Sequence, residues 1–256
     1  MAERVGMLID VTKCIACRAC QVACKQWNQL PATVTRQLGT YQNPPHLNGT
    51  TWTLIQFVEP ADGPVRWLFR KEACKHCGDP TCVQVCPTGA CRQRPDGIVE
   101  INPKTCAGCK YCVETCPFSI PKPDPGTGNA RKCRMCLDRV DAGLKPACTT
   151  ACLTGAIQFG TRAAMLAKAQ ERKAQLAKEG HAAVRIYGEN ELGGLGVMYV
   201  LPESAETYLL PDKPQKPTVK IFVKWLMGLV PGLALLMALG VYLWKDRTPK
   251  TQAEGK

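Results

Sequence analysis

Cysteines are the residues of this chain that could do chemistry, and their spacing is regular. The chain has 256 residues and 17 cysteines, and the segment CIACRACQVACKQWN (residues 14–28) holds four of them within eleven residues. Sixteen cysteines fall into four groups of four. In chain order, the groups are Cys14, Cys17, Cys20 and Cys24; Cys74, Cys77, Cys82 and Cys86; Cys106, Cys109, Cys112 and Cys116; and Cys133, Cys136, Cys148 and Cys152.

The spacing of the first and third groups is C-x-x-C-x-x-C-x-x-x-C, which is typical of bacterial ferredoxins. Three closely spaced thiolates wrap one corner of a cubane 4Fe-4S cluster, whereas the fourth cysteine starts the next helix and points towards a different cluster. The pattern therefore predicts four 4Fe-4S clusters held by all sixteen grouped cysteines. The remaining one, Cys91, is interpreted as a small buried hydrophobic residue.

The distances between groups along the chain predict which of them share clusters. The second and third groups are joined by CRQRPDGIVEINPKT (residues 91–105), which favours a hairpin around Pro95–Gly97. We call these two groups the inner module, and the first and fourth groups, into which it is inserted, the outer module. The predicted ligand sets are Cys14, Cys17, Cys20 with Cys152; Cys24 with Cys133, Cys136, Cys148; Cys74, Cys77, Cys82 with Cys116; and Cys86 with Cys106, Cys109, Cys112.

Internal repetition supports two related modules. The segment IDVTKCIAC (residues 9–17) is similar to INPKTCAGC (residues 101–109), and CPTGAC (residues 86–91) is similar to CLTGAI (residues 152–157). Cys91 then occupies the place of Ile157. Each module is expected to begin as a short strand that runs into a cluster loop.

Structural zinc and disulfides are the two other common uses of cysteine in proteins. Structural zinc sites favour two separated C-x-x-C pairs, and disulfide frameworks suit small secreted scaffolds. Neither fits three cysteines at successive three-residue steps followed by a fourth. His76, within CKHC, is interpreted as a packing or hydrogen-bonding residue because its group already has four thiolates. No Ser-His-Asp set, P-loop or dinucleotide fingerprint is present, so no catalytic residue is predicted.

The formal net charge of +12 would ordinarily favour nucleic acid or anionic lipid as a partner. Each 4Fe-4S cluster with four thiolates carries about −2, so four clusters lower the net charge to about +4. A zinc-containing nucleic-acid-binding protein is therefore the disfavoured alternative. Several cations stand beside the ligands, where a nearby positive charge would raise a cluster's potential, although a solvated surface position is the expectation for any single one. They are Lys13, Arg18, Lys25, Lys75, Lys104, Lys110, Lys132 and Arg134.

The sequence predicts an α+β fold with a four-cluster ferredoxin-like domain over residues 1–160, the inner module covering about 70–121. An insertion at 25–73 carries a β-rich segment, Thr51–Glu59, expected to cover one face of the cluster core. Residues 161–210 form an extension, including an exposed alanine-rich helix at 161–179 capped by Thr161 and stopped by Gly180. A linker (211–220), a single transmembrane helix (221–244) and a tail (245–256) follow.

The transmembrane prediction rests on residues 225–244, which contain no charge over a length that can cross a bilayer as a helix. Tryptophans and basic residues flank the segment, as is usual at membrane interfaces. Lysines are balanced on the two sides, so the positive-inside rule gives no orientation. No signal region is recognised in MAERVGMLID.

The chain resembles the four-cluster β subunits of the complex iron-sulfur molybdoenzymes, and among them those of membrane-bound respiratory formate dehydrogenases. The similarity lies in CKHCGDPTCVQVCPTGA, CAGCKYCVETCPF, KCRMCLDRVDAGLKPACTTACLTGAI and GGLGVMYVLPE, with Trp27 and the terminal helix narrowing it towards formate dehydrogenase. Leu153 departs from the proline common after the last cysteine, and we expect it to alter a local turn and not ligation.

The resemblance implies a non-catalytic electron-transfer subunit. A catalytic α subunit with a molybdenum or tungsten pterin would oxidise formate, and a membrane γ subunit of the cytochrome b type would receive the electrons and reduce quinone. It also implies an inner-membrane location with the cluster domain on the periplasmic side, by co-export with the partner. The alternative is the equivalent subunit of a hydrogenase or of a sulfur-compound reductase.

Overall fold

In the computed structural model, residues 3–61, 63–217 and 232–243 are described. The chain divides into two units, residues 1–216 and 217–256. The first unit contains both predicted modules and the whole of the predicted extension. Its strands are β1 (Val5–Asp10), β2 (Leu54–Val58), β3 (Leu68–Glu72), β4 (Cys91–Gln93), β5 (Val99–Ile101), β6 (Lys122–Pro123), β7 (Ala130–Arg131), β8 (Ile157–Thr161), β9 (Arg185–Tyr187) and β10 (Val197–Leu201). Its α-helices are α1 (Ala19–Trp27), α2 (Thr81–Gln84), α3 (Tyr111–Thr115), α4 (Leu137–Asp141), α5 (Ala147–Thr150) and α6 (Arg162–Lys178).

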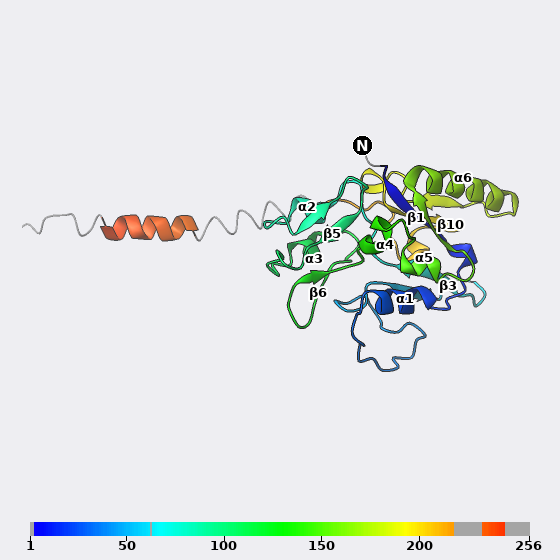
Figure 1. Ribbon diagram of the computed structural model, residues 1–256, viewed down its shortest axis with the longest axis horizontal. Coiled ribbons are helices and arrows are strands. Elements are labelled where there is room, and N and C mark those ends of the chain that lie inside the picture. The colour runs from blue at the N-terminus through cyan, green and yellow to red at the C-terminus, as the bar shows by residue number, and fades with distance from the viewer. Residues whose placement is uncertain (1–2, 62, 218–231, 244–256) are drawn as a thin grey trace, which may run out of the picture. The chain divides into compact units, whose positions relative to one another are not determined.

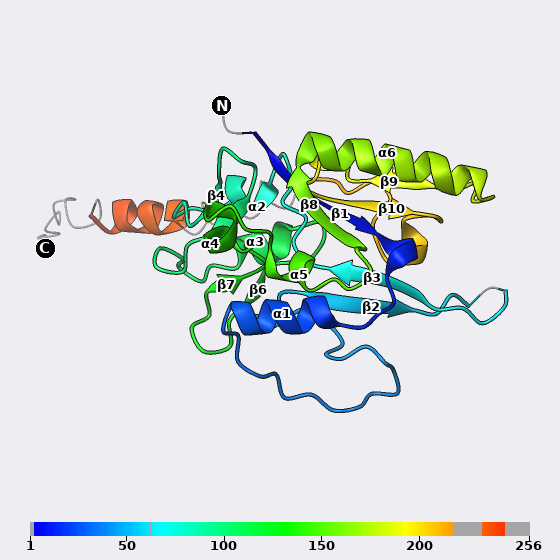
Figure 2. The same cartoon turned by 45° about the vertical axis from the view of Figure 1, so that its right-hand side comes forward.

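A four-stranded sheet in the order β8-β1-β10-β9 forms the frame of this unit. Strand β1 pairs antiparallel with β8, where Ile9 lies opposite Ile157, and parallel with β10. Side chains alternate between the two faces, as the pleat of a strand requires. Leu8 and Met198 belong to the apolar cluster under α6, while Met7 and Ile9 belong to the larger core on the opposite face. Figure 2 shows α6 on one side of the sheet and the β2–β3 hairpin with α1 on the other.

The α6 helix corrects one expectation and confirms another. Thr161 caps it by accepting a hydrogen bond from the amide of Ala164, and Gly180 with φ of 96° follows its end, as predicted. The expectation that this helix is exposed was wrong for one face, because Met165, Ala169 and Leu176 are buried against the sheet. Ala169 on that face is fully buried, and its small side chain lets the helix approach the strands closely. Figure 1 labels α6 and strands β1 and β10 of this sheet.

The predicted hairpin and the predicted β-rich segment are both present. The β-rich segment of the insertion forms β2, which pairs antiparallel with β3. The segment between the second and third cysteine groups forms the β4–β5 hairpin, in which Cys91 lies opposite Ile101. The sheet, the β2–β3 hairpin and the short helices thus surround the cysteine-rich loops.

The predicted transmembrane helix falls partly outside the described residues, at 221–231 and 244. Residues 232–243 are helical with exposed side chains. Within the ranges that the structure describes, no helix is both long and apolar enough to cross a membrane.

Candidate iron-sulfur sites

All seventeen cysteines are free thiols, without a disulfide among them. In the described part of the chain, no three His, Cys, Asp or Glu side chains are arranged as a site for a single metal ion. The four thiolates of a cubane bind four different iron atoms, so their sulfurs lie farther apart than the ligands of one ion.

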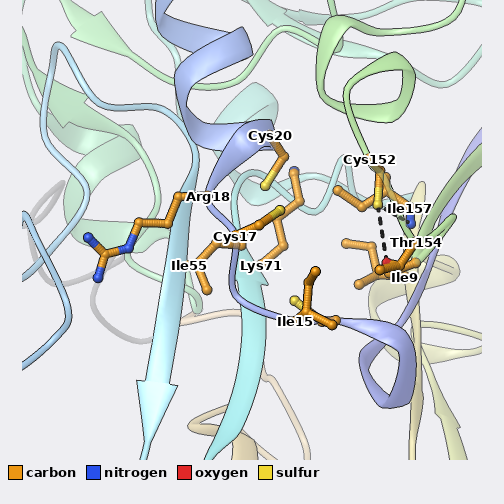
Figure 3. A pocket seen from close by; sticks show the side chains of 12 residues that line it. Ile9, Ile15, Cys17, Arg18, Cys20, Ile55, Lys71, Cys152, Thr154 and Ile157 are labelled. Atoms are coloured by element: carbon orange, nitrogen blue, oxygen red, sulfur yellow. Dashed lines mark hydrogen bonds between the residues drawn. The ribbon is translucent and has the colours of Figure 1, made fainter.

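The first predicted set lines one cavity. Cys14 and Cys17 come from the loop that leads from β1 into α1, and Cys20 lies in the first turn of α1. Cys152 comes from the turn before β8, and Figure 3 shows it facing the cavity with Cys17 and Cys20. Most of the other lining is aliphatic, from Ile9, Ile15, Ile55, Ala156 and Ile157. Burial, followed by neighbouring cysteines and opposed by Lys71, raises the pKa of Cys20 to about 12. The Cys20 thiol is therefore neutral when free, and binding to iron would remove its proton outright.

The loop geometry that presents these thiols depends on left-handed residues. Ala16 and Arg18 have φ of 54° and 60°, and the N-cap of α1 is Arg18. The third group repeats this geometry, with Gly108 at φ 66° and Lys110 at φ 63° before α3. Left-handed turns at these positions reverse the chain sharply enough to bring successive thiols onto one side.

The second predicted set meets where α1 packs on α5. Cys24 follows Cys20 by one helical turn, and its pKa is raised to about 11 by burial, with smaller contributions from Cys148 and Cys136. Burial also raises the pKa of Cys133, whose neighbours include Cys24 and Cys148. The four predicted members are thus brought together from both ends of the outer module.

The inner module shows two similar groupings. Burial raises the pKa of Cys77, and its neighbours Cys74, Cys116 and Cys82 raise it further, so the third predicted set lies together. Cys86, Cys106 and Cys112 of the fourth predicted set pack around Cys91. The fourth member, Cys109, is exposed on the loop before α3 and is not in this packed group.

The turn after the last cysteine is the same in both modules. The amide of Cys91 donates to Cys86 Sγ at 3.3 Å, and the amide of Ile157 donates to Cys152 Sγ at 3.4 Å. Gly89 and Gly155 both have φ of 65° and donate to the carbonyls of Cys86 and Cys152, each at 3.3 Å. The expectation that Leu153 alters this turn was wrong, because the glycine and these hydrogen bonds set its shape.

Cys91 and His76 have the environments predicted for them. Cys91 is 3% exposed and packs among the inner-module cysteines. Its hydrogen bond to Cys112 is the main cause that lowers the pKa of Cys112 to about 7. His76 is buried, and its Nδ1 accepts a hydrogen bond from the Val99 amide at 3.0 Å. Burial, followed by Lys132 and Lys71, lowers the pKa of His76, so its ring is neutral.

Buried cations were largely missed by sequence reasoning. Lys75 and Lys132, expected to be solvated, are 1% and 5% exposed, and Lys71, which no pattern marked, is 2% exposed. Arg70 is also buried. Glu72 pairs with Arg70 and Lys75, but no described Asp or Glu forms an ion pair with Lys71 or Lys132. The high density of charged residues in the run RKEACKHC was a signal that could have marked this segment. It does not indicate which of these side chains point inward.

The residues present fit the predicted clusters. An uncompensated cation in a protein interior is strongly unfavourable unless an opposite charge lies nearby. Lys71 lines the first cavity beside Cys20, and the cysteines near Lys132, Cys74 first, raise the pKa of this lysine despite its burial. A cluster with four thiolates carries about −2 and supplies the missing negative charge. Thiol donors and buried cations together match an anionic iron-sulfur cofactor.

Comparison with known proteins defines the class. Two family models described as "4Fe-4S dicluster domain" match residues 13–90 and residues 65–162. Together they span all four cysteine groups, which makes the chain an iron-sulfur protein of the dicluster ferredoxin-like class. The matched ranges overlap between 65 and 90, so they do not coincide with the nested modules.

Individual relatives narrow the assignment. The chain is 42% identical over 234 residues to the formate dehydrogenase-O iron-sulfur subunit of Escherichia coli, covering 91% of this chain and 78% of the relative. It is 41% identical over 232 residues to the nitrate-inducible formate dehydrogenase iron-sulfur subunit of the same organism, covering 90% and 79%. Formate dehydrogenase 2 subunit beta (cytochrome c-553) of Nitratidesulfovibrio vulgaris is 40% identical over 213 residues, covering 79% and 95%. The chain belongs to the family of formate dehydrogenase iron-sulfur subunits.

Proposed function

We propose that this chain is the electron-transfer subunit of a formate dehydrogenase complex, carrying four 4Fe-4S clusters in the ligand sets predicted above. A catalytic subunit with a molybdenum or tungsten pterin would oxidise formate and deliver the electrons to this chain one at a time. A membrane subunit of the cytochrome b type would receive them and reduce quinone. The observation that carries the proposal is the convergence of Cys14, Cys17, Cys20 and Cys152 in one cavity, in a chain of this family.

The clusters supply one-electron redox chemistry, and the protein's own residues would hold and space them. Cys20 and Cys24 lie one turn apart on α1 and belong to different predicted sets, so this helix would connect two cluster sites directly. In the inner module, Cys82 lies within α2 and Cys86 follows two residues after its end, and they too belong to different predicted sets. Cys133, in the outer module, has Cys74 of the inner module among its neighbours, which would join the two pairs into one path.

The test uses the intact complex, purified anaerobically through a tag on this chain. Adding formate should promptly bleach the visible absorbance of the clusters on the electron path. Dithionite added afterwards should cause no further bleaching of those clusters. Bleaching with dithionite alone would keep the electron-transfer role and remove formate as the donor. Hydrogen and reduced sulfur compounds would then be tried, because a hydrogenase or sulfur-compound reductase is the alternative complex.

Membrane attachment is a second part of the proposal, and it rests on the uncharged run at residues 225–244 and its basic, aromatic flanks. Residues 221–244 would span the inner membrane, with the cluster domain on the periplasmic side after co-export with the catalytic partner. Deleting residues 219–256 should release the cluster-containing complex from membranes washed with alkaline carbonate. Continued attachment would mean that a partner subunit anchors it.

The identity of the acceptor can be tested separately. One relative has cytochrome c-553 in its name, which makes a soluble cytochrome the second candidate acceptor. Formate-reduced complex should be reoxidised by a quinone analogue in the membrane form of the complex. Reoxidation by a c-type cytochrome and not by quinone would exchange the acceptor without changing the role of this chain.

A further inference from the structure

Lys71 occupies the junction between the two cluster sites of the outer module. It lies on β3 and lines the first cavity with Cys14, Cys17, Cys20 and Cys152 (Figure 3). Burial alone would lower its pKa, but the cysteines Cys148, Cys133 and Cys20 outweigh burial and raise it. These three cysteines belong to both outer-module sets, so the amine lies between the two sites.

Lys132 occupies the corresponding place in the inner module. Its amine donates hydrogen bonds to the carbonyls of Val99 and Cys133, and it lowers the pKa values of Cys82, Cys112 and Cys116. These cysteines are drawn from both inner-module sets. Lys71 lowers the pKa values of Cys20, Cys24 and Cys133 in the outer module, whereas the cysteines whose pKa values Lys132 lowers lie in the inner module. The outer-module residue Cys133 is nevertheless among the cysteines that raise the pKa of Lys132 itself, after Cys74 and Cys82.

The two lysines are exchanged between the modules. Lys71 lies three residues before Cys74, the first inner-module ligand, yet its side chain reaches the outer module. Lys132 immediately precedes Cys133 of the outer module, yet its side chain reaches the inner module. Burial, followed by smaller effects of Lys132 and Lys71, lowers the pKa of His76. Each module therefore receives its interior cation from the segment that leads into a ligand group of the other.

Other buried cations differ because they are neutralised locally. Lys75 donates to Glu72 at 2.7 Å and to the Tyr199 hydroxyl at 2.8 Å. Arg70 pairs with the same carboxylate and donates to the Tyr208 carbonyl at 2.6 Å. Only Lys71 and Lys132 combine burial with the absence of a described carboxylate partner and with direct proximity to the candidate ligands of two sites.

We propose that Lys71 and Lys132 are reciprocal potential-setting residues, Lys71 raising the reduction potentials of the outer-module clusters and Lys132 those of the inner-module clusters. Reduction adds one negative charge to a cluster, and a fixed cation in a low-dielectric interior stabilises that charge more than a solvated cation does. The inference rests on the proposed function only in requiring that the sites hold clusters. The reduction potentials in the outer and inner halves of the electron path would thus be set by two different lysines.

The experiment replaces each lysine by methionine, which keeps the length of the side chain and removes its charge. Lys71→Met and Lys132→Met complexes are titrated with dithionite and redox mediators and followed by electron paramagnetic resonance. Signals are assigned to modules with Cys20→Ser and Cys112→Ser variants. Lys71→Met should shift the reduction equilibrium of the outer-module clusters at least tenfold towards the oxidised state, or 59 mV for one electron. Lys132→Met should do the same for the inner-module clusters.

Each variant is the control for the other, and exposed lysines provide a second control. Lys13 precedes Cys14, and Lys104 lies two residues before Cys106, and both are exposed. Lys13→Met and Lys104→Met remove the same charge near the same sites, but solvent screens it, so their potentials should stay close to those of the unmodified complex. Unchanged potentials in the Lys71→Met and Lys132→Met complexes, or equal shifts of both modules by either variant, would overturn the proposal.

Assembly is checked by iron content, and Lys71→Arg separates charge from packing. If Lys71→Met loses iron while Lys71→Arg keeps full iron content and near-normal potentials, the positive charge is required at this site, as proposed. If Lys71→Arg shifts the potentials as far as Lys71→Met, or also loses iron, Lys71 acts by packing and the proposal fails. Formate is not needed for these titrations. Failure of formate to reduce otherwise normal clusters would disprove the donor alone, and normal reduction with unshifted potentials would disprove the role of the lysines alone.

Discussion

The outer and inner modules share local geometry but differ in what supports it. Asp10 Oδ1 accepts a hydrogen bond from the Thr12 amide at 3.0 Å, and Asn102 Oδ1 accepts one from the Lys104 amide at 3.0 Å, at equivalent positions before the two cluster loops. The outer strands β1 and β8 belong to a four-stranded sheet covered by α6, whereas β4 and β5 form an isolated three-residue hairpin. Loop geometry is thus encoded by the short motif, and resistance to unfolding comes from the scaffold around it.

Removing iron should produce the largest difference in stability between the outer and inner modules. Without clusters, residues 80–116 keep a short hairpin and a small apolar group around Cys91, while Lys132 loses its counter-charge. The segment at Lys75 and His76 differs because its carbonyls accept hydrogen bonds from the amides of Val197 and Gly196. We expect amide exchange over residues 80–93 and 102–116 to approach that of an unfolded chain in the iron-depleted complex, while β1 and β10 stay protected by the α6-covered sheet. Hydrogen exchange with mass spectrometry measures this, and iron and sulfide reconstitution is the control. Equal loss of protection in both modules would show that the sheet also depends on the clusters.

Removing one ligand from each module should have effects confined to that module. Cys20 and Cys112 are the third cysteines of equivalent runs, and they are 5% and 7% exposed. Cys20→Ser should damage the cluster at the first cavity and block electron flow, leaving the inner-module signals intact, and Cys112→Ser should do the reverse. Cys91→Ile, which installs the residue of the sister module, should keep all four clusters. Iron content and paramagnetic resonance spectra report the outcome. A fully occupied, electron-transferring Cys20→Ser complex would contradict the ligand assignment.

The residue before each cluster loop offers a smaller test of the scaffold. Asp10 is 2% exposed and pairs with Arg172 of α6, Nε to Oδ2 at 2.9 Å, so it links the loop to the helix. Asp10→Asn keeps the acceptor for Thr12 but removes the charge opposite Arg172, and should destabilise the outer module by about 1–3 kcal/mol. Asn102→Asp in the half-buried inner position should change stability by about 0.5 kcal/mol or less. Native-state amide exchange at β1 and β5 measures the loss of stability in each variant. Equal losses in the two variants would show that the pairing of Asp10 with α6 does not stabilise the outer module.

Sequence spacing predicted the local parts of the structure and few of the distant ones. The hairpin at Pro95–Gly97, the cap at Thr161 and the repeat equivalence of Cys91 with Ile157 all depend on neighbouring residues, and all are confirmed. The parallel pairing of β1 with β10 was not predicted, because the strands are far apart in the chain and a buried strand carries no mark of its partner. Lys71 was missed for the same reason, since its inward position follows from the pairing of β3 with β2.

The turns after Cys86 and Cys152 should show the smallest difference between the outer and inner modules. The inner module has Pro87 where the outer module has Leu153, and the two turns make the same hydrogen bonds. Leu153 is 80% exposed, so its side chain contributes little packing. Because the sister turn accommodates proline, Leu153→Pro should stabilise the outer module by about 0.4–1 kcal/mol through the unfolded chain, and Pro87→Leu should destabilise the inner module by a similar amount. Thermal loss of cluster absorbance, measured on both variant complexes, would show the opposite shifts. A Leu153→Pro complex that loses its cluster more readily would mean that the shared hydrogen bonds do not make the turns interchangeable.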